Sequence, residues 1–272
     1  MTMPAHERND AVLHCRDIEL AFGGLRALKG VSFEIGQGEI FGLVGPNGSG
    51  KTSMVNVITG FYRPQGGSVV VFGEDMTRMK PHRIATRGVA RTFQNLALFR
   101  GMTVLENILL GRHIHMQAGA LSTLFYWVWA LRNEVANRRI VEELIDFMQL
   151  QDIRDEPVET IPLGLQKRVE LARALAAEPK LLILDEPMAG MNQEEKEYIA
   201  RFILDAREER NTTVLLIEHH MDVVTSLCDR VMVLSYGESI AQGKPKDAIA
   251  DPRVVSAYLG QRAAARHVGT AA

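Results

Sequence analysis

Cysteine is scarce in this sequence, and net charge is nearly absent. Only two cysteines, Cys15 and Cys228, occur among 272 residues, and they form no C-x-x-C pair. This usage suits a reducing cytosol and gives no indication of a metal site, so we expect two ordinary small apolar side chains. Lys and Arg total 31 and Asp and Glu total 33, for a formal net charge of −2. The balance argues against nucleic acid as a partner and leaves room only for a local basic patch.

Long hydrophobic runs are missing as well. The longest uncharged run, residues 116–131, contains Gln117, Ser122 and Thr123. It falls short of the roughly 20 predominantly apolar residues that a membrane-spanning helix needs. The first ten residues are polar, so we predict no secretory signal. We therefore expect a soluble chain, long enough for one large α/β domain or two small ones.

A glycine-rich stretch is the strongest feature that the sequence does contain. It fits the phosphate-binding pattern G-x-x-x-x-G-K-[ST] at every fixed position, with Gly45, Pro46, Asn47, Gly48, Ser49, Gly50, Lys51 and Thr52. A buried strand is predicted over 39–44, and a helix that includes Thr52 and Ser53 is predicted to point its first amides at the loop. Because strand, loop and helix agree, we prefer a nucleotide site to an ordinary glycine-rich turn. Lys51 is expected at the β- and γ-phosphates and the Thr52 hydroxyl at Mg²⁺.

Two further apolar runs end close to polar residues that suit phosphate chemistry. Residues 181–184 lead into Asp185 and Glu186, and residues 214–217 are followed closely by His219. Such runs predict parallel strands buried on both faces, whose carboxyl ends share the edge where α/β proteins bind ligands. Asp185 is predicted to hold hydrated Mg²⁺, Glu186 to orient and deprotonate a water, and His219 to donate to a γ-phosphate. Without the phosphate loop, the acidic pair would be interpreted as a solvated strand end.

Two single residues have weaker support from the sequence. Phe22 stands beside two glycines ahead of the phosphate loop, where its ring suits stacking on adenine, although a core position fits equally well. Gln94 lies near the end of a strand predicted over 89–95, and its amide oxygen suits contact with the metal or the attacking water. Taken alone, Gln94 would be interpreted as a surface amide.

The remaining elements are predicted from periodicity. Alternating apolar residues predict antiparallel strands at 12–22 and 31–35, another strand at 66–73 and a closing hairpin at 229–241. Short and long helices are predicted at 81–88 and 166–177.

Between residues 103 and 150 the apolar spacing becomes helical, which predicts an insert into the α/β core. Within the insert, residues 124–129 contain both tryptophans. We expect these aromatics to pack inside the insert, and the alternative is a sticky surface that contacts another protein.

Taken in order, these features resemble the ATPase subunit of ABC transporters over roughly residues 12–260. The resemblance implies an α/β fold with ABC ATPase architecture: a P-loop NTPase core with a mainly parallel sheet, an N-terminal antiparallel β-subdomain and a helical insert. The implied parts are an N-terminal tail at 1–11, a core at 12–95 and 161–260, a helical subdomain at 96–160, and a mobile tail at 261–272.

The resemblance also implies roles for single residues. Phe22 matches the adenine-stacking residue, and Gln94 matches the Q-loop glutamine, which is catalytic and helps Thr52 and Asp185 to organise Mg²⁺. Glu186 matches the catalytic glutamate and His219 the switch histidine. The D-loop matches residues 189–192.

The signature motif departs from the family pattern. Residues 161–165 read Ile-Pro-Leu-Gly-Leu where Leu-Ser-Gly-Gly-Gln is usual, so Pro162 replaces the Ser whose hydroxyl reaches the γ-phosphate. Gly164 remains, and the helix after it still offers N-terminal amides to an anion. Similar Pro-containing signatures occur among importers of branched-chain amino acids, so we interpret the change as a family variant.

Several blocks are similar to that importer subfamily, namely residues 22–28, 58–64, 91–95 and 102–107. The insert around 114–137 and the ending at 257–260 resemble its longer ATPase subunit. This likeness implies ATP and Mg²⁺ as cofactors, a second ATPase subunit (a copy or a homologous chain) joined head to tail, and transmembrane permease subunits. It also implies an indirect link to a periplasmic or extracellular solute-binding protein, and a peripheral place on the cytoplasmic face of the bacterial inner membrane.

Other functions compete with this interpretation. Uptake of urea or short amides and export of lipopolysaccharide belong to related ABC groups, although the export ATPases usually have a shorter insert. Soluble ABC proteins that act on ribosomes or DNA usually carry two ATPase halves, whereas this chain has one phosphate loop. A small GTPase would require an Asn-Lys-x-Asp motif, which the sequence lacks. A non-hydrolytic interaction module is disfavoured by Asp185 and Glu186.

Overall fold

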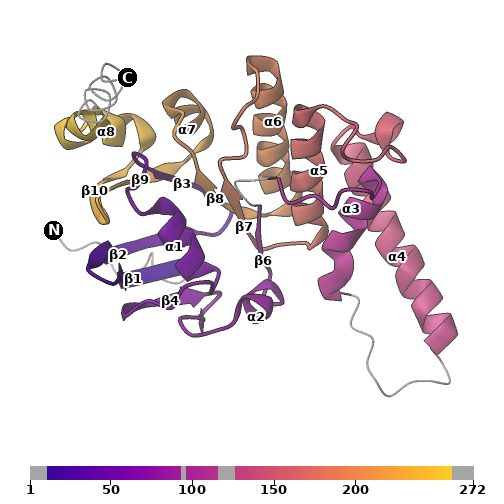
Figure 1. Ribbon diagram of the computed structural model, residues 1–272, viewed down its shortest axis with the longest axis horizontal. Coiled ribbons are helices and arrows are strands. Elements are labelled where there is room, and N and C mark those ends of the chain that lie inside the picture. Colours follow the sequence, from indigo (N-terminus) through magenta and orange to yellow (C-terminus); the bar gives the residue numbers. More distant parts are fainter. Residues whose placement is uncertain (1–10, 93–95, 116–125, 259–272) are drawn as a thin grey trace.

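Two β-sheets form the framework of the computed structural model, which describes residues 11–92, 96–115 and 126–258, with only the backbone described for 126–134. One sheet has four strands in the order β2-β1-β4-β5, and the other has six in the order β10-β9-β3-β8-β7-β6 (Figure 1). The fold is therefore α/β with a separate antiparallel sheet, as the sequence predicts.

The four-stranded sheet is antiparallel throughout. Its strands are β1 (Ala11–Phe22), β2 (Leu25–Gly36), β4 (Gly66–Val71) and β5 (Glu74–Asp75). Buried and exposed residues alternate along much of β2, which is why this part of the sequence shows a strand pattern. This sheet is the predicted N-terminal β-subdomain.

The six-stranded sheet is parallel except for its edge strand β10. Its strands are β3 (Ile40–Val44), β6 (Val89–Arg91), β7 (Leu181–Asp185), β8 (Thr213–Ile217), β9 (Arg230–Ser235) and β10 (Glu238–Gly243). Every residue of β3, β7 and β8 is buried, which explains their unbroken apolar runs. The predicted strand over 89–95 is shorter than expected, because β6 ends at Arg91.

Helices connect and cover these strands. They are α1 (Lys51–Ile58), α2 (Pro81–Ala85), α3 (Val104–Leu110), α4 (Tyr126–Phe147), α5 (Leu163–Ala176), α6 (Gln193–Arg210), α7 (Met221–Leu227) and α8 (Pro245–Ala250). Two 3₁₀ turns, η1 (Gly111–His115) and η2 (Gln151–Ile153), flank α4. Helix α5 starts before the predicted Gln166, at Leu163, and Pro162 occupies its N-cap position.

Two hydrophobic cores lie on opposite faces of the parallel sheet. Leu182 and Leu184 of β7 belong to the core that includes the helical region, while Leu181 and Ile183 belong to the core beneath the antiparallel sheet. Helices α3 and α4 stand to one side of the sheet, and α5 contacts both of them as well as β6 (Figure 1). Burial on both faces fixes where each strand ends, which places the residues that follow it.

The structure leaves several predictions untested. The tails, the tryptophan-containing stretch at 124–129 and Gln94 lie outside the residues whose side chains are described. The subdomain boundaries also stay predictions. Among the described helices, none combines the length and the apolar character that crossing a bilayer requires.

Both cysteines are free and buried, so we predict that they are unreactive in the folded chain. Burial raises the pKa of the Cys15 thiol far above its usual range and raises that of Cys228 to about 12. The thiolate is the reactive form, so an aromatic disulfide reagent at neutral pH should modify neither thiol in native protein and both in urea. Rapid modification of a thiol before unfolding would contradict this burial.

Candidate functional site

The phosphate loop connects the end of β3 to the start of α1, and its glycines adopt conformations that other residues avoid. Gly45, Gly48 and Gly50 have φ angles of 151°, 75° and 111°. A Cβ on Gly45 would collide with the carbonyl oxygen of Leu234, and one on Gly50 would lie 2.8 Å from that of Ala27. The left-handed backbone favours glycine at all three positions, and close packing adds to this requirement at Gly45 and Gly50.

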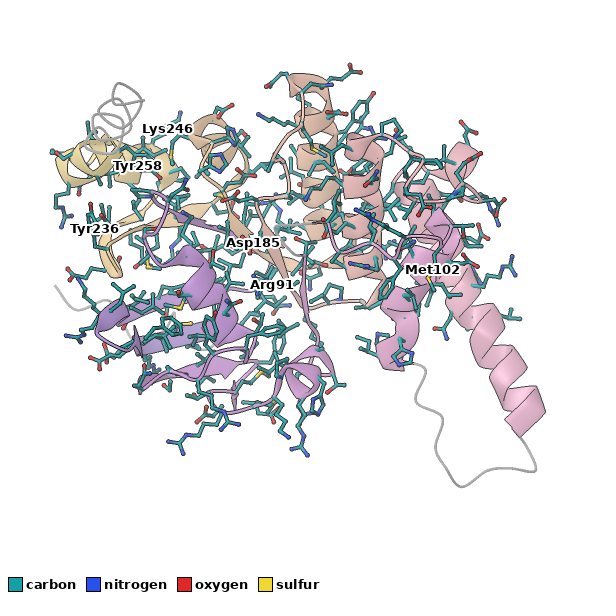
Figure 2. All side chains as sticks on the ribbon, viewed as in Figure 1. Arg91, Met102, Asp185, Tyr236, Lys246 and Tyr258 are labelled. Atoms are coloured by element: carbon teal, nitrogen blue, oxygen red, sulfur yellow. The ribbon has the colours of Figure 1, made fainter. Side chains whose placement is uncertain are left out.

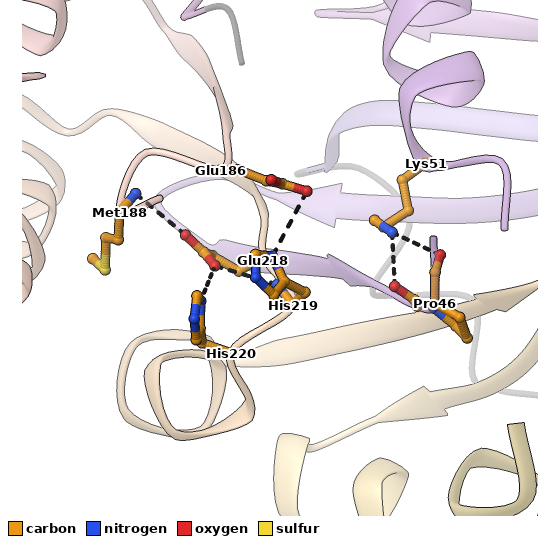
Figure 3. Close-up of polar contacts among 8 residues, drawn as sticks. Pro46, Lys51, Glu186, Met188, Glu218, His219 and His220 are labelled. Carbon is orange, nitrogen blue, oxygen red and sulfur yellow. Dashed lines mark hydrogen bonds and ion pairs between the residues drawn. The ribbon is translucent and has the colours of Figure 1, made fainter. Parts of the chain in front are cut away.

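Lys51 is the first residue of α1, and its side chain reaches back to the start of this loop. Its Nζ donates hydrogen bonds to the carbonyl oxygens of Gly45 at 2.7 Å and Pro46 at 2.9 Å (Figure 3). The residue is 7% exposed, and burial lowers the pKa of its ammonium, while the nearby carboxylates of Glu186 and Asp185 raise it. The loop therefore holds a buried cation beside two acids, at the start of a helix whose free amides favour anions.

A cleft of about 820 Å³ opens beside the loop. Its lining comes from separate parts of the chain and includes Phe22, Asn47, Gly48, Ser49, Gly50, Lys51, Thr52, Ser53, Glu186, His219 and Tyr236. Phe22 is 45% exposed and meets the ring of Tyr62 edge-on, with centroids 5.1 Å apart. Phe22 is therefore a cleft residue and not a core residue, while its stacking on adenine stays a prediction.

Asp185, at the end of β7, is 1% exposed and paired with a cation that the sequence analysis overlooked. Arg91 Nη2 donates to Asp185 Oδ2 at 2.8 Å (Figure 2). Arg91 Nη1 donates to Asn56 Oδ1 on α1 at 2.6 Å. The Asp185 amide also donates to Thr92 Oγ1 at 3.3 Å. Arg91 thus joins β6, β7 and the helix after the phosphate loop. Its position at the end of an apolar strand is the sequence feature from which this role could have been predicted.

Glu186 follows directly and adopts a left-handed backbone conformation, with φ of 49°. Such a conformation costs about 1 kcal/mol or more in a residue other than glycine, and active sites are one of the places where it is retained. The Glu186 amide donates to the Ile217 carbonyl at 2.9 Å, which ties the end of β7 to β8. Its carboxylate, with the side chain 16% exposed, lies 3.7 Å from His219 Nδ1 (Figure 3).

His219 is positioned by the buried residue before it. Glu218 is fully buried and accepts hydrogen bonds from the backbone amides of Met188 at 3.4 Å and His219 at 3.2 Å. Its carboxylate also lies 3.2 Å from His220 Nδ1. Glu218 therefore links the segment after β7 to the segment after β8, a role that the sequence pattern did not indicate.

Gly164 lies apart from this cleft and is not among its lining residues. It sits in the first turn of α5, where a Cβ would collide with the carboxylate of Glu195. Pro162 occupies the N-cap position and supplies no side-chain hydrogen bond. The predicted contact of Gly164 with a nucleotide therefore stays a prediction, as does the role of Gln94, which lies outside the described residues.

The oxygen donors at the site suit a magnesium ion. Thr52 lines the cleft and carries a hydroxyl, and Asp185, the last residue of β7, carries two carboxylate oxygens, one of which accepts a hydrogen bond from Arg91. Mg²⁺ prefers such hard oxygen ligands and is usually bound by one or two protein groups together with phosphates and waters. The donor set therefore fits the ion.

Comparisons with known proteins agree with this geometry. Residues 28–189, more than half of the chain, match the family described as ABC transporter. The high-affinity branched-chain amino acid transport ATP-binding protein BraF of Pseudomonas aeruginosa is 37% identical over 250 residues, covering 92% of this chain and 98% of BraF. LivG of Escherichia coli K12, described in the same words, is 36% identical with the same coverage. A crystal structure of the ADP conformation of an ATP-binding cassette is 34% identical with a TM-score of 0.78, covering 92% and 99% of the two chains.

Replacing Lys51 tests the phosphate loop. Lys51→Ala removes the buried ammonium, and hydrogen bonds to charged groups contribute about 1.5–3 kcal/mol, so ATP affinity should fall about 10- to 100-fold. Isothermal titration with ATP measures the effect, with circular dichroism to verify folding. Lys246→Ala, on the exposed surface of α8, is the matched control and should bind ATP normally. Equal affinity in both variants would contradict the role of Lys51.

Proposed function

The chain belongs to the ABC transporter family, and from that premise we propose that it is the ATP-hydrolysing subunit of an importer for branched-chain amino acids. The observation that supports hydrolysis is the meeting of Lys51 and Glu186 in one cleft. The amino acid substrate is supported by the descriptions of BraF and LivG, which this chain resembles over nearly its whole length. Neither relative supports urea uptake or lipopolysaccharide export, so these stay lesser alternatives.

ATP binding follows from the charges at the cleft. Lys51 and the amides at the start of α1 bind the phosphates, and Phe22 stacks on the adenine ring. Thr52, Asp185 and Gln94 would hold Mg²⁺, which would supply positive charge to offset that of the phosphates. Arg91 keeps the Asp185 carboxylate in place from β6.

Hydrolysis requires a base next to the terminal phosphate. The Glu186 carboxylate orients a water and takes its proton as the water oxygen attacks the γ-phosphorus, while the bond from that phosphorus to the β–γ bridging oxygen breaks and ADP leaves with the bonding electrons. His219, held 3.7 Å from Glu186, donates to the γ-phosphate and stabilises the charge that develops on its oxygens. Glu218 keeps His219 on this side of the cleft through its bond to the His219 amide.

A second ATPase subunit completes the site. The amides at the N-terminus of α5, beside Gly164, suit an anion but do not line the cleft of their own chain. A partner copy or a homologous chain, placed head to tail, brings its Gly164 helix to this ATP. Neither chain then hydrolyses efficiently alone.

An apolar groove of about 550 Å³ offers a docking surface for a permease. It runs between α2, β6, η1 and α5, and Phe61 and Phe99 on its rim are 55% and 54% exposed. Exposed aromatics around an apolar groove are typical of protein contact sites. Arg91 also lines the groove, so movement there reaches Asp185 directly. Docked on the permease in this way, the subunit lies peripherally on the cytoplasmic face of a bacterial inner membrane. The solute-binding protein lies across the bilayer, and nucleic acid has no role.

Replacing Glu186 tests hydrolysis separately from binding. Glu186→Gln removes the base, and general base catalysis contributes about 10²- to 10⁴-fold, so phosphate release should fall by that factor while ATP affinity persists. Glu194→Gln, an exposed change in the first turn of α6, is the control and should hydrolyse normally. A Gln variant that loses ATP binding, or keeps its rate, would show that Glu186 has another role.

Reconstitution tests the transported substrate. The chain is co-expressed with the permease and solute-binding proteins encoded beside it, and the complex is placed in vesicles with ATP on the cytoplasmic side. We expect ATP-dependent uptake of leucine, isoleucine and valine, abolished by Glu186→Gln. Uptake of urea in place of leucine would overturn the amino acid assignment while leaving the ATPase assignment intact.

A further inference from the structure

A group of basic side chains surrounds the start of α2. We call it the basic patch and define it as Arg63, Arg78, Lys80, His82 and Arg83, all of which are exposed and line one shallow hollow. The chain as a whole carries a net charge of −2, so this local excess of positive charge runs against the overall balance.

The cations of the basic patch are unpaired in the described part of the chain. No ion pair or side-chain hydrogen bond there involves the guanidinium groups of Arg63, Arg78 or Arg83, or the Lys80 ammonium, whereas neighbouring Arg87 is paired with Glu74 at 2.7 Å. Exposed cations that have no protein partner create a local positive potential, which attracts anions.

Acidic residues do little to offset this charge. Asp75 is the carboxylate that lines the hollow, and it accepts hydrogen bonds from the Thr77 hydroxyl and amide. The pKa of Asp75 is lowered, first by the Thr77 side-chain and backbone hydrogen bonds and to a smaller extent by Arg78. One ionised carboxylate among four permanent cations leaves the surface strongly positive.

The basic patch adjoins the apolar groove assigned to the permease. His82 lines both, and Pro81 and Ile84 of the same short helix line the groove. Figure 1 shows α2 beside β4 and below the start of β6. If the groove receives a permease, the basic patch faces the same way and lies beside the bilayer; this step rests on the proposed function.

We propose that the basic patch binds the anionic phospholipid headgroups of the cytoplasmic leaflet. Long, unpaired side chains on separate segments suit a fluid layer of phosphates, since each cation can find its own headgroup. A specific protein contact would instead favour arginines held in fixed positions by hydrogen bonds. Lipid binding would hold the ATPase against the membrane and orient its groove toward the permease.

The test uses the full chain alone with lipid vesicles. It should co-sediment with vesicles of phosphatidylglycerol and phosphatidylcholine, and not with phosphatidylcholine alone. Because surface charges are screened by salt, binding should be strong at about 0.05 M NaCl and largely lost at about 0.5 M. Changing Arg63, Arg78, Lys80 and Arg83 together to Gln should lower vesicle affinity about tenfold or more while leaving ATP hydrolysis unchanged.

A matched variant removes the same charge elsewhere. It changes Arg16, Lys180, Lys244 and Lys246 to Gln, which are exposed residues outside the basic patch. Thermal unfolding should show that both variants fold. Equal loss of binding in the two variants would reduce the effect to net charge and overturn the proposal, as would failure of the unmodified chain to bind anionic vesicles.

A third outcome separates lipid from protein. If the unmodified chain does not bind vesicles but the patch variant fails to assemble with the permease, the basic patch binds an acidic permease segment and the proposal is wrong. Because the vesicles contain no permease, failure here leaves the transporter assignment standing. Failure of amino acid uptake would likewise leave lipid binding intact.

Discussion

The burial of parallel strands on both faces is the constraint on which the site depends. Strands β3, β7 and β8 are completely buried, so polar side chains can appear only where these strands end. Because the strands are parallel and adjacent, their carboxyl ends meet at one edge. The phosphate loop, the acids after β7 and the histidine after β8 are brought together for this reason, although they lie far apart in the sequence.

Opposite charges face one another at this edge. Two buried or nearly buried cations, Lys51 and Arg91, face Asp185 and Glu186, and each charge lowers the energy of the opposite one. The arrangement couples the sites, since Arg91 reaches both Asp185 and the helix that begins with Lys51. If one of these charges were removed, the desolvation free energy of its buried partner would no longer be offset.

The surfaces that we assign to partners lie away from the cleft yet connect to it. Gly164 sits on α5, which contacts the helical region and β6, and the apolar groove reaches Arg91 itself. Elements that join two surfaces in this way can pass a movement from one to the other as rigid bodies. Such an arrangement suits an ATPase that uses ATP hydrolysis to move another protein.

The sequence by itself determined the phosphate loop, the acidic pair, His219 and nearly every strand, because these depend on local spacing and on apolar runs. It could not place Phe22, which only the open cleft distinguishes from a core residue. Nor could it pair Arg91 with Asp185 or Glu218 with Met188, because those contacts join segments distant in the chain. Only the tertiary structure established these contacts, because the order of strands in a sheet cannot be predicted from any one segment of the sequence.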